Sequence, residues 1–131
     1  MFLLAIILAI VSLFLVGFMS GTIYQSSIDK LDECGPSNRT HTIRIGKDSF
    51  TPSRLEANRC DKLVFYNNDA KMRAVVFGTF ENHVPYGEFA TEYLRPKERV
   101  SLKLFKVGTF DFHDHTRQDF EGVLIVNAPE E

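Results

Sequence analysis

Hydrophobic and polar residues follow two different patterns along this chain. Residues 1–28 contain no charged side chain, and residues 2–18 include one polar residue, Ser12. From residue 40 onward, apolar and polar positions alternate over short stretches, which is the pattern of strands with one buried face. The chain is therefore predicted to join an apolar N-terminal segment to a domain built from β-strands.

The alternation predicts about seven short strands. Residues 109–113 alternate Phe110 and Phe112 with Asp111 and His113, so the two phenylalanines are expected to face the core. Residues 122–126 form an apolar run, which is typical of a strand buried on both faces. Further strands are predicted within residues 41–47, 50–56, 61–66, 73–78 and 100–105.

Residues 78–97 carry no period and are expected to be irregular. No helical period follows the apolar segment, and short strands separated by turn residues are typical of sandwiches. The predicted fold class is all-β: an antiparallel Greek-key β-sandwich preceded by one N-terminal transmembrane helix.

The apolar segment is long enough to cross a membrane, because about 20 helical residues span the hydrocarbon core. The first basic residue is Lys30, and the missing basic start favours a retained anchor over a signal peptide cut near Ser20 and Gly21. Residues 1–24 are predicted to be the anchor, residues 25–39 a linker and residues 40–128 the domain.

The two cysteines, Cys34 and Cys60, lack the CxxC spacing of a zinc or redox motif. A disulfide between them would tie the linker to the domain, and the alternative is two free thiols. A small all-β domain with a disulfide suits an oxidising compartment. The protein is expected to be membrane-anchored, with its domain on the extracytoplasmic side, in the periplasm or at the cell surface.

The charge balance argues against one class of partner. The 15 basic and 17 acidic residues give a net charge of −2, whereas a nucleic-acid binder needs a basic stripe. The expected partners are the membrane, through the N-terminal helix, and a membrane protein. No Ser-His-Asp pattern, phosphate-binding glycine loop or carboxylate pair is present, so the chain is not expected to be an enzyme.

The order of strand landmarks resembles that of the cupredoxins. The chain reads HTIRIGKDSFTPSRLEA, then LVFYNNDAKMRAVVF, then LRPKERVSLKLFKVGTFDFHDH and finally FEGVLIV. This resemblance extends from Thr40 to Ala128 and implies a cupredoxin-like domain. A blue copper site in this family uses two histidines, one cysteine and a weak axial methionine.

All four of those ligand positions are changed in this chain. The resemblance places Arg73 and Arg117 at the histidine positions, Asp114 at the cysteine position and Phe120 at the methionine position. A blue or binuclear copper centre is not expected without the thiolate. One interpretation is that Arg73, Asp114 and Arg117 form an ion cluster there, in a metal-free accessory or interaction subunit of a membrane complex.

The other interpretation is a different metal site. The chain resembles a cupredoxin-like variant that has His-Asp-His in place of the cysteine and methionine loop, which makes His113, His115 and His83 the candidate ligands. Asp114 is a further ligand or a group that orients a histidine. Imidazoles suit copper, zinc or nickel, and copper is the predicted cofactor, with no cofactor as the alternative.

Strand geometry places this candidate site on the outside of the sandwich. His113 and His115 face away from Phe110, Phe112 and Asp114, so a metal would lie at the surface or at the strand end. The predicted function is therefore a non-enzymatic, membrane-anchored module that binds copper at a non-blue histidine site, for copper handling or electron transfer.

Overall fold

The structure is a computed structural model that describes residue 34 and residues 39–128. The predicted anchor, and the linker except for residues 34 and 39, lie outside the described residues. Within the described part of the chain, no helix has the length and hydropathy needed to span a membrane. The described domain is all-β, as predicted.

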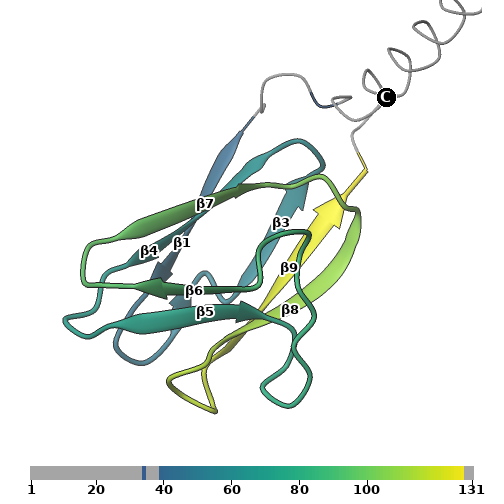
Figure 1. Cartoon of the computed structure of the whole chain (residues 1–131). Helices are drawn as coiled ribbons and strands as arrows, with labels where there is room; N and C mark the ends of the chain where they lie inside the picture. Colours follow the sequence, from purple (N-terminus) through teal and green to yellow (C-terminus); the bar gives the residue numbers. More distant parts are fainter. Residues whose placement is uncertain (1–33, 35–38, 129–131) are drawn as a thin grey trace, which may run out of the picture. The chain divides into compact units, whose positions relative to one another are not determined.

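Two β-sheets form the domain (Figure 1). One sheet has the strand order β2-β1-β4-β7, and the other has the order β3-β9-β8-β5-β6. The strands are β1 (Thr40–Ile45), β2 (Phe50–Thr51), β3 (Arg54–Asn58), β4 (Lys62–Asn67), β5 (Arg73–Phe77), β6 (Thr91–Leu94), β7 (Arg99–Lys103), β8 (Gly108–Asp114) and β9 (Glu121–Asn127).

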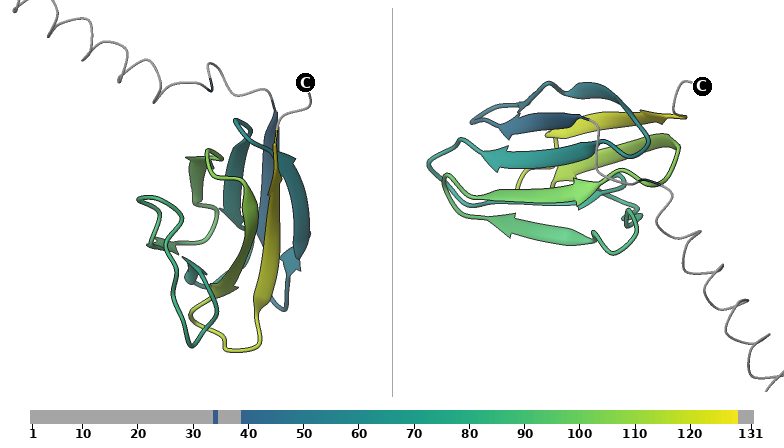
Figure 2. Two further views of the ribbon diagram at one scale, coloured as in Figure 1. Left: turned by 90° about the vertical axis from the view of Figure 1, so that its right-hand side faces the viewer. Right: turned by 90° about the horizontal axis from the view of Figure 1, so that it is seen from above.

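Both sheets are mixed, so the prediction of a purely antiparallel sandwich is wrong. β1 pairs with β4 in parallel, and β3 pairs with β9 in parallel. The chain passes from the first sheet to the second between β2 and β3, and β4 then returns beside β1 (Figure 2). Alternation along one strand identifies its buried face but carries no information on the direction of its neighbour.

The core lies between the sheets and is rich in phenylalanine. Phe112 of β8 is fully buried, and its ring centroid lies 4.9 Å from that of Phe50 and 5.3 Å from that of Phe65. Phe77 of β5 meets Phe112 edge-on at 6.2 Å. Edge-to-face pairs of this kind stabilise a core beyond the area that they bury. The expected inward direction of Phe112 is confirmed.

Two details of the strands differ from the prediction. β6 lies within residues 78–97, the segment expected to be irregular. It was not predicted because its exposed Thr91 and Tyr93 give no apolar period. β9 is not buried on both faces, since Val123 and Ile125 are half-buried. Val123 and Ile125 belong to the outward face of the second sheet, where apolar residues can stay partly exposed.

Both cysteines of the chain, Cys34 and Cys60, are disulfide-bonded, as predicted. Cys60 is buried in the turn between β3 and β4. Its backbone N–H donates to the Leu104 carbonyl at 2.6 Å. The covalent link therefore attaches residue 34 to a turn that is itself held against the β7–β8 connection.

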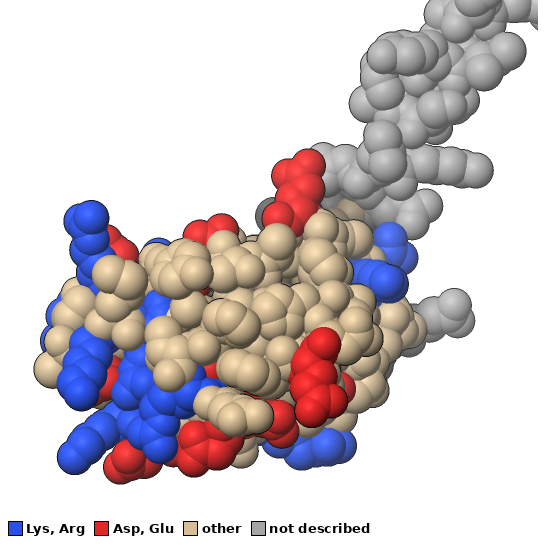
Figure 3. Space-filling model, turned by 60° about the horizontal axis from the view of Figure 1, so that its bottom comes forward, with Lys and Arg blue, Asp and Glu red and all other residues tan. Residues whose placement is uncertain are grey.

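Charged side chains are unevenly distributed over the domain. Figure 3 shows Lys and Arg gathered at one end of a face whose middle is largely uncharged. That end carries the β4–β5 and β6–β7 turns (Figure 1), where the exposed basic residues include Lys71, Arg95, Lys97 and Arg99.

A close approach between β8 and β9 gives the first testable prediction. Gly122 pairs with Phe112, and a Cβ at Gly122 would overlap the Phe112 ring. Because the ring has aromatic neighbours on several sides, Gly122→Ala should lower the free energy of unfolding by about 1–3 kcal/mol. Urea unfolding followed by circular dichroism measures this loss. Ala90→Val, at an exposed position, is the control and should change stability little.

Candidate metal centre

His113 lies on the outward face of β8, and His115 follows Asp114, the last residue of that strand. Strand alternation turns Phe112 and Asp114 inward, so His113 and His115 point to the other side of the sheet. β8 lies between β5 and β9, and His113 is paired with Val76 on one side and Glu121 on the other. His113 is therefore held by the middle of a sheet, and the backbone N–H of His115 donates to the Ala74 carbonyl at 2.8 Å.

The segment that follows β5 folds back over this face. Gly78 and His83 form an antiparallel bridge, and the Val84 N–H donates to the Phe77 carbonyl at 3.0 Å. Between them, Thr79 and Asn82 close a tight turn with reciprocal backbone hydrogen bonds of 3.0 and 3.2 Å. We call residues 78–84 the histidine loop, because it brings His83 back to β8.

Gly78 allows this loop to start where it does. Its φ is +94°, in the region that favours glycine, and a Cβ there would overlap the Asn82 carbonyl. The sequence RAVVFG ends a strand in a glycine, which is a signal for a turn but not for its direction. The fold of the loop, and therefore the position of His83, was beyond what the sequence pattern could predict.

Phe80 covers His113 and His115. Its ring stacks on His115 with 5.1 Å between centroids and an interplanar angle of 22°, and meets the edge of His113 at 5.7 Å. As a result His113 is fully buried, whereas His83 and His115 stay exposed. The candidate site is on the outward face, as expected, but the histidine loop and Phe80 partly enclose it.

The structure brings together the three histidines that the sequence nominated. Ring centroids are 5.0 Å apart for His83 and His113, 4.9 Å for His83 and His115, and 5.6 Å for His113 and His115. One ring nitrogen of each lies within 4.8 Å of those of the other two. Among the described residues, this is the cluster of potential metal ligands.

A metal ion would require only a small contraction of this arrangement. Nitrogens that bind a tetrahedral ion at about 2.0–2.1 Å lie roughly 3.4 Å apart. His113 Nε2 and His115 Nδ1 are already at 3.4 Å. His83 is exposed, and its ring nitrogen lies within 4.8 Å of those of the other two histidines.

One hydrogen bond fixes the tautomer of His113. Its Nδ1 lies 2.8 Å from the Gly78 carbonyl oxygen, which can only accept, so the proton is on Nδ1. The lone pair is then on Nε2, which faces His115 and the third imidazole. Metal-binding histidines commonly donate their second nitrogen to a carbonyl in this manner.

The charge state of His113 also suits a ligand. Burial lowers the pKa of its ring, since desolvation penalises the imidazolium, and the neighbouring His83 and His115 lower it further. The Gly78 carbonyl and Glu121 act in the opposite direction but do not reverse the shift. A neutral imidazole is the form that binds metals.

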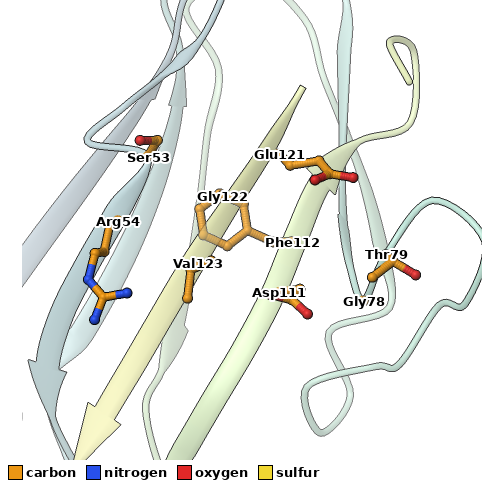
Figure 4. A pocket seen from close by; sticks show the side chains of 9 residues that line it. All are labelled: Ser53, Arg54, Gly78, Thr79, Asp111, Phe112, Glu121, Gly122 and Val123. Carbon is orange, nitrogen blue, oxygen red and sulfur yellow. The ribbon is translucent and has the colours of Figure 1, made fainter. Parts of the chain in front are cut away.

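A hollow of about 360 Å³ adjoins the site on the outward face of β8, β9 and β3. Figure 4 shows Asp111 and Glu121 on one side of it and Arg54 on the other, with Gly78 and Thr79 of the histidine loop at its edge. The two carboxylates flank His113 along β8 and β9. Two carboxylates and one guanidinium therefore line this hollow, beside the strand residue His113.

Asp114 does not face the three histidines. It is fully buried on the inward side, where its Oδ1 accepts from the Thr116 N–H at 2.9 Å and from the Thr116 hydroxyl at 2.6 Å. Arg73 Nη1 lies 3.4 Å from Asp114 Oδ2. The aspartate thus belongs to the buried ion pair predicted for the former copper position, not to the histidine cluster.

Arg73 is held mainly by another carboxylate. Its Nε and Nη2 donate to Asp69 Oδ2 at 2.9 and 2.6 Å, and Nη2 also donates to the Lys47 carbonyl at 3.0 Å. The Arg73 side chain is 6% exposed, so this set of partners satisfies a buried guanidinium.

Arg117 does not complete the predicted ion cluster. Its guanidinium donates to the Lys47 carbonyl at 3.1 Å and pairs loosely with Asp48 and Asp119, each at 3.6 Å. Phe120, at the former methionine position, is buried beneath Arg73, whose Cζ lies 5.5 Å from the ring centroid. The position that the resemblance to cupredoxins assigns to copper is therefore filled by a salt bridge and an aromatic ring.

Comparisons with known proteins agree with this architecture. No protein-family model and no curated protein matches the sequence. Among solved structures, a purple cupredoxin from Nitrosopumilus maritimus superposes with a TM-score of 0.58 and 14% identity, covering 66% of this chain and 98% of that one. The chain contains a cupredoxin-like domain.

Amicyanin variants give the same result for the cupredoxin-like domain. A reduced variant has a TM-score of 0.57 and 19% identity, covering 67% of this chain and 82% of amicyanin. A Cu(I) form of another variant has a TM-score of 0.57 and 20% identity over the same shares. At these identities the likeness concerns the fold alone. The chemistry of the histidine cluster depends on the residues of this chain.

The hydrogen bond of His113 predicts its behaviour in the protein without added metal. Nitrogen-15 NMR should show Nδ1 protonated and Nε2 bare, with a pKa below the value of about 6.5 for a free imidazole. In the unfolded chain the His113 ring has its ordinary, higher pKa and binds a second proton more readily. The free energy of unfolding therefore decreases as the pH falls below about 6.5. A normal pKa, or a proton on Nε2, would contradict the described burial and hydrogen bond.

The buried ion pair predicts a large effect on stability. Arg73→Ala leaves Asp69 and Asp114 without their cation and should cost about 3–5 kcal/mol in the free energy of unfolding. Arg54→Ala is the matched control, because Arg54 pairs with Glu56 at 3.7 Å with both side chains more than 60% exposed. The control should lose at most about 1 kcal/mol. If Arg73→Ala and Arg54→Ala lower the free energy of urea unfolding equally, the buried Arg73 ion pair stabilises the fold no more than an exposed pair does.

Proposed function

We propose that this chain is a membrane-anchored, non-enzymatic cupredoxin-like module that binds copper through His83, His113 and His115 on the extracytoplasmic side of a membrane. The observation that carries the proposal is the convergence of three imidazoles, whose ring nitrogens lie within 4.8 Å of one another. Only two of them are neighbours in sequence, so the fold has brought the third from a separate loop.

The choice of copper rests on the donor set. Three imidazoles without a thiolate or thioether suit copper or zinc. The cupredoxin fold favours copper, since one similar structure is described as the Cu(I) form of an amicyanin variant. No blue centre is proposed, because Asp114 stands where the cysteine of such a centre would be.

The exposure of the ligands favours copper handling over long-term storage. His113 is buried and fixed by Gly78, whereas His83 and His115 are exposed. A metal can therefore enter and leave through movements of two surface side chains, without opening the core. An electron-transfer role additionally requires that both copper valences stay bound at the same site.

The metal-free alternative is weaker on structural grounds. The Arg73–Asp114 pair is present, but it lies on the inward side of the sheet, whereas the histidines lie on the outward side. The ion pair therefore fills the former copper position without competing with the histidine cluster. It accounts for the loss of a blue site and leaves a second site available.

Calorimetric titration of the full-length protein in detergent tests the proposal, with Cu(II), with Cu(I) under reducing conditions and with Zn(II). We expect one-to-one, submicromolar copper binding. His83→Ala and His115→Ala should each weaken it at least tenfold, because each removes one of three ligands. These two residues are exposed, so their removal leaves the core intact.

His41→Ala is the matched control, because His41 pairs with Asp61 at 2.8 Å and is not one of the clustered histidines. Its copper affinity should equal that of the unaltered protein. Weak or multiple binding that survives removal of both His83 and His115 would end the proposal and return the domain to a scaffolding role. Tight binding of one copper valence alone supports handling, and comparable binding of both supports electron transfer.

A further inference from the structure

One end of the domain combines exposed apolar and basic residues. The strand register brings Thr40 of β1 beside Lys62 of β4, and Lys62 beside Lys103 of β7. The turn between β3 and β4 and the connection between β7 and β8 therefore meet at this end (Figure 1). We call residues 59–61 and 104–107 the base loops.

Hydrogen bonds join the two base loops to each other. Cys60 N–H donates to the Leu104 carbonyl at 2.6 Å, and Leu104 N–H donates to the Asp61 carbonyl at 2.8 Å. Arg59 Nε donates to the Phe105 carbonyl at 3.1 Å. Because of these bonds, the side chains on the β7–β8 loop are displayed by an ordered backbone.

That loop exposes two large apolar side chains. Phe105 and Val107 are each 49% exposed. Tyr86 holds the residue between them, since its hydroxyl lies 2.8 Å from both the Lys106 N–H and the Lys106 carbonyl. A single exposed apolar residue needs no explanation, but two on a fixed loop form a surface that favours an apolar environment.

Exposed basic residues gather at this end, together with the exposed Glu56, which lies near Arg39 and Asp61. Arg39, Lys62 and Lys106 are exposed, whereas the carboxylate of Asp61 is buried and paired with His41 at 2.8 Å. Aromatic and aliphatic side chains beside Lys and Arg are the composition of segments that lie at a membrane surface. The opposite end is also basic, so charge alone does not select this one.

Covalent connectivity selects the base. Cys60 belongs to a base loop, and its disulfide joins it to Cys34. The uncharged run of residues 1–28 ends six residues before Cys34, and six residues span at most about 20 Å. The base is thus tied by a short, covalently closed connection to the segment proposed to enter the membrane.

We propose that the base loops contact the surface of the phospholipid bilayer, with Phe105 and Val107 entering the interface and Lys62 and Lys106 meeting lipid phosphates. This inference rests on the membrane anchoring in the proposed function. The contact attaches the domain to the membrane by its base and directs the β4–β5 and β6–β7 turns away from the bilayer.

The chain offers a clean reporter for this contact, because it contains no tryptophan. Phe105→Trp places a single fluorophore on the base, and Met72→Trp places one in the β4–β5 turn at the opposite end, where Met72 is 52% exposed. Each full-length variant is reconstituted into vesicles of phosphatidylcholine and phosphatidylglycerol, with and without bromine-labelled phosphatidylcholine. Flotation of the vesicles reports anchoring separately from the fluorescence.

We expect both variants to float with the vesicles. The Phe105→Trp emission should shift to shorter wavelength and be quenched by the brominated lipid, whereas the Met72→Trp emission should resemble that of exposed indole and stay unquenched. Lys106→Glu in the Phe105→Trp background should reduce the quenching. Copper binding should be the same in all these variants, since none of the substitutions touches the histidine cluster.

Three results would overturn the inference. If the protein floats and Phe105→Trp is no more quenched than Met72→Trp, the base does not contact lipid although the anchor holds. If the Phe105→Trp emission is blue-shifted but insensitive to brominated lipid, the base is covered by protein, for example by the acidic linker at Asp29 to Glu33. If the protein does not float, the proposed anchoring fails and the inference fails with it.

Discussion

The candidate metal centre depends on the alternation of side chains along β8. Phe112 must be inside, because it contacts Phe50, Phe65 and Phe77 at the centre of the core. Once its direction is fixed, Asp114 points inward as well and His113 and His115 point outward. A register shift of one residue would bury both histidines in the core and expose the aspartate, so core packing and site geometry are set by one constraint.

The same constraint places two different groups of polar side chains on opposite sides of the second sheet. On the inward side, Asp114 and Arg73 pair with each other, and Thr116 and Asp69 supply further partners. The charged groups on this side therefore already have partners within the protein. On the outward side, the three imidazoles satisfy only part of their hydrogen-bonding capacity among themselves. A metal ion can be added there without disturbing a single buried charge.

The sequence predicted the residues of the site better than their surroundings. The two-residue period placed His113 and His115 on one face, and the resemblance to cupredoxins named His83. The enclosure of His113 by Phe80, and its hydrogen bond to Gly78, depend on the path of the histidine loop. That path follows from the positive φ of Gly78 and from the bridge between Gly78 and His83, and neither leaves a period in the sequence. The parallel strand pairs escaped prediction for a similar reason, since strand direction is set by where the chain crosses between sheets.

The histidine loop therefore has two roles that are physically linked. Its first residue, Gly78, supplies the carbonyl that keeps the proton on His113 Nδ1, and its bridge partner, His83, supplies the third imidazole. A loop that moved away would remove a ligand and free the His113 ring at the same time. Under the proposed function, metal affinity should then depend on the stability of this short segment more than on that of the sandwich, because His113 and His115 supply only two of the three nitrogens. Under the proposed function, metal can thus exchange at the histidine cluster while the Phe112 core stays packed.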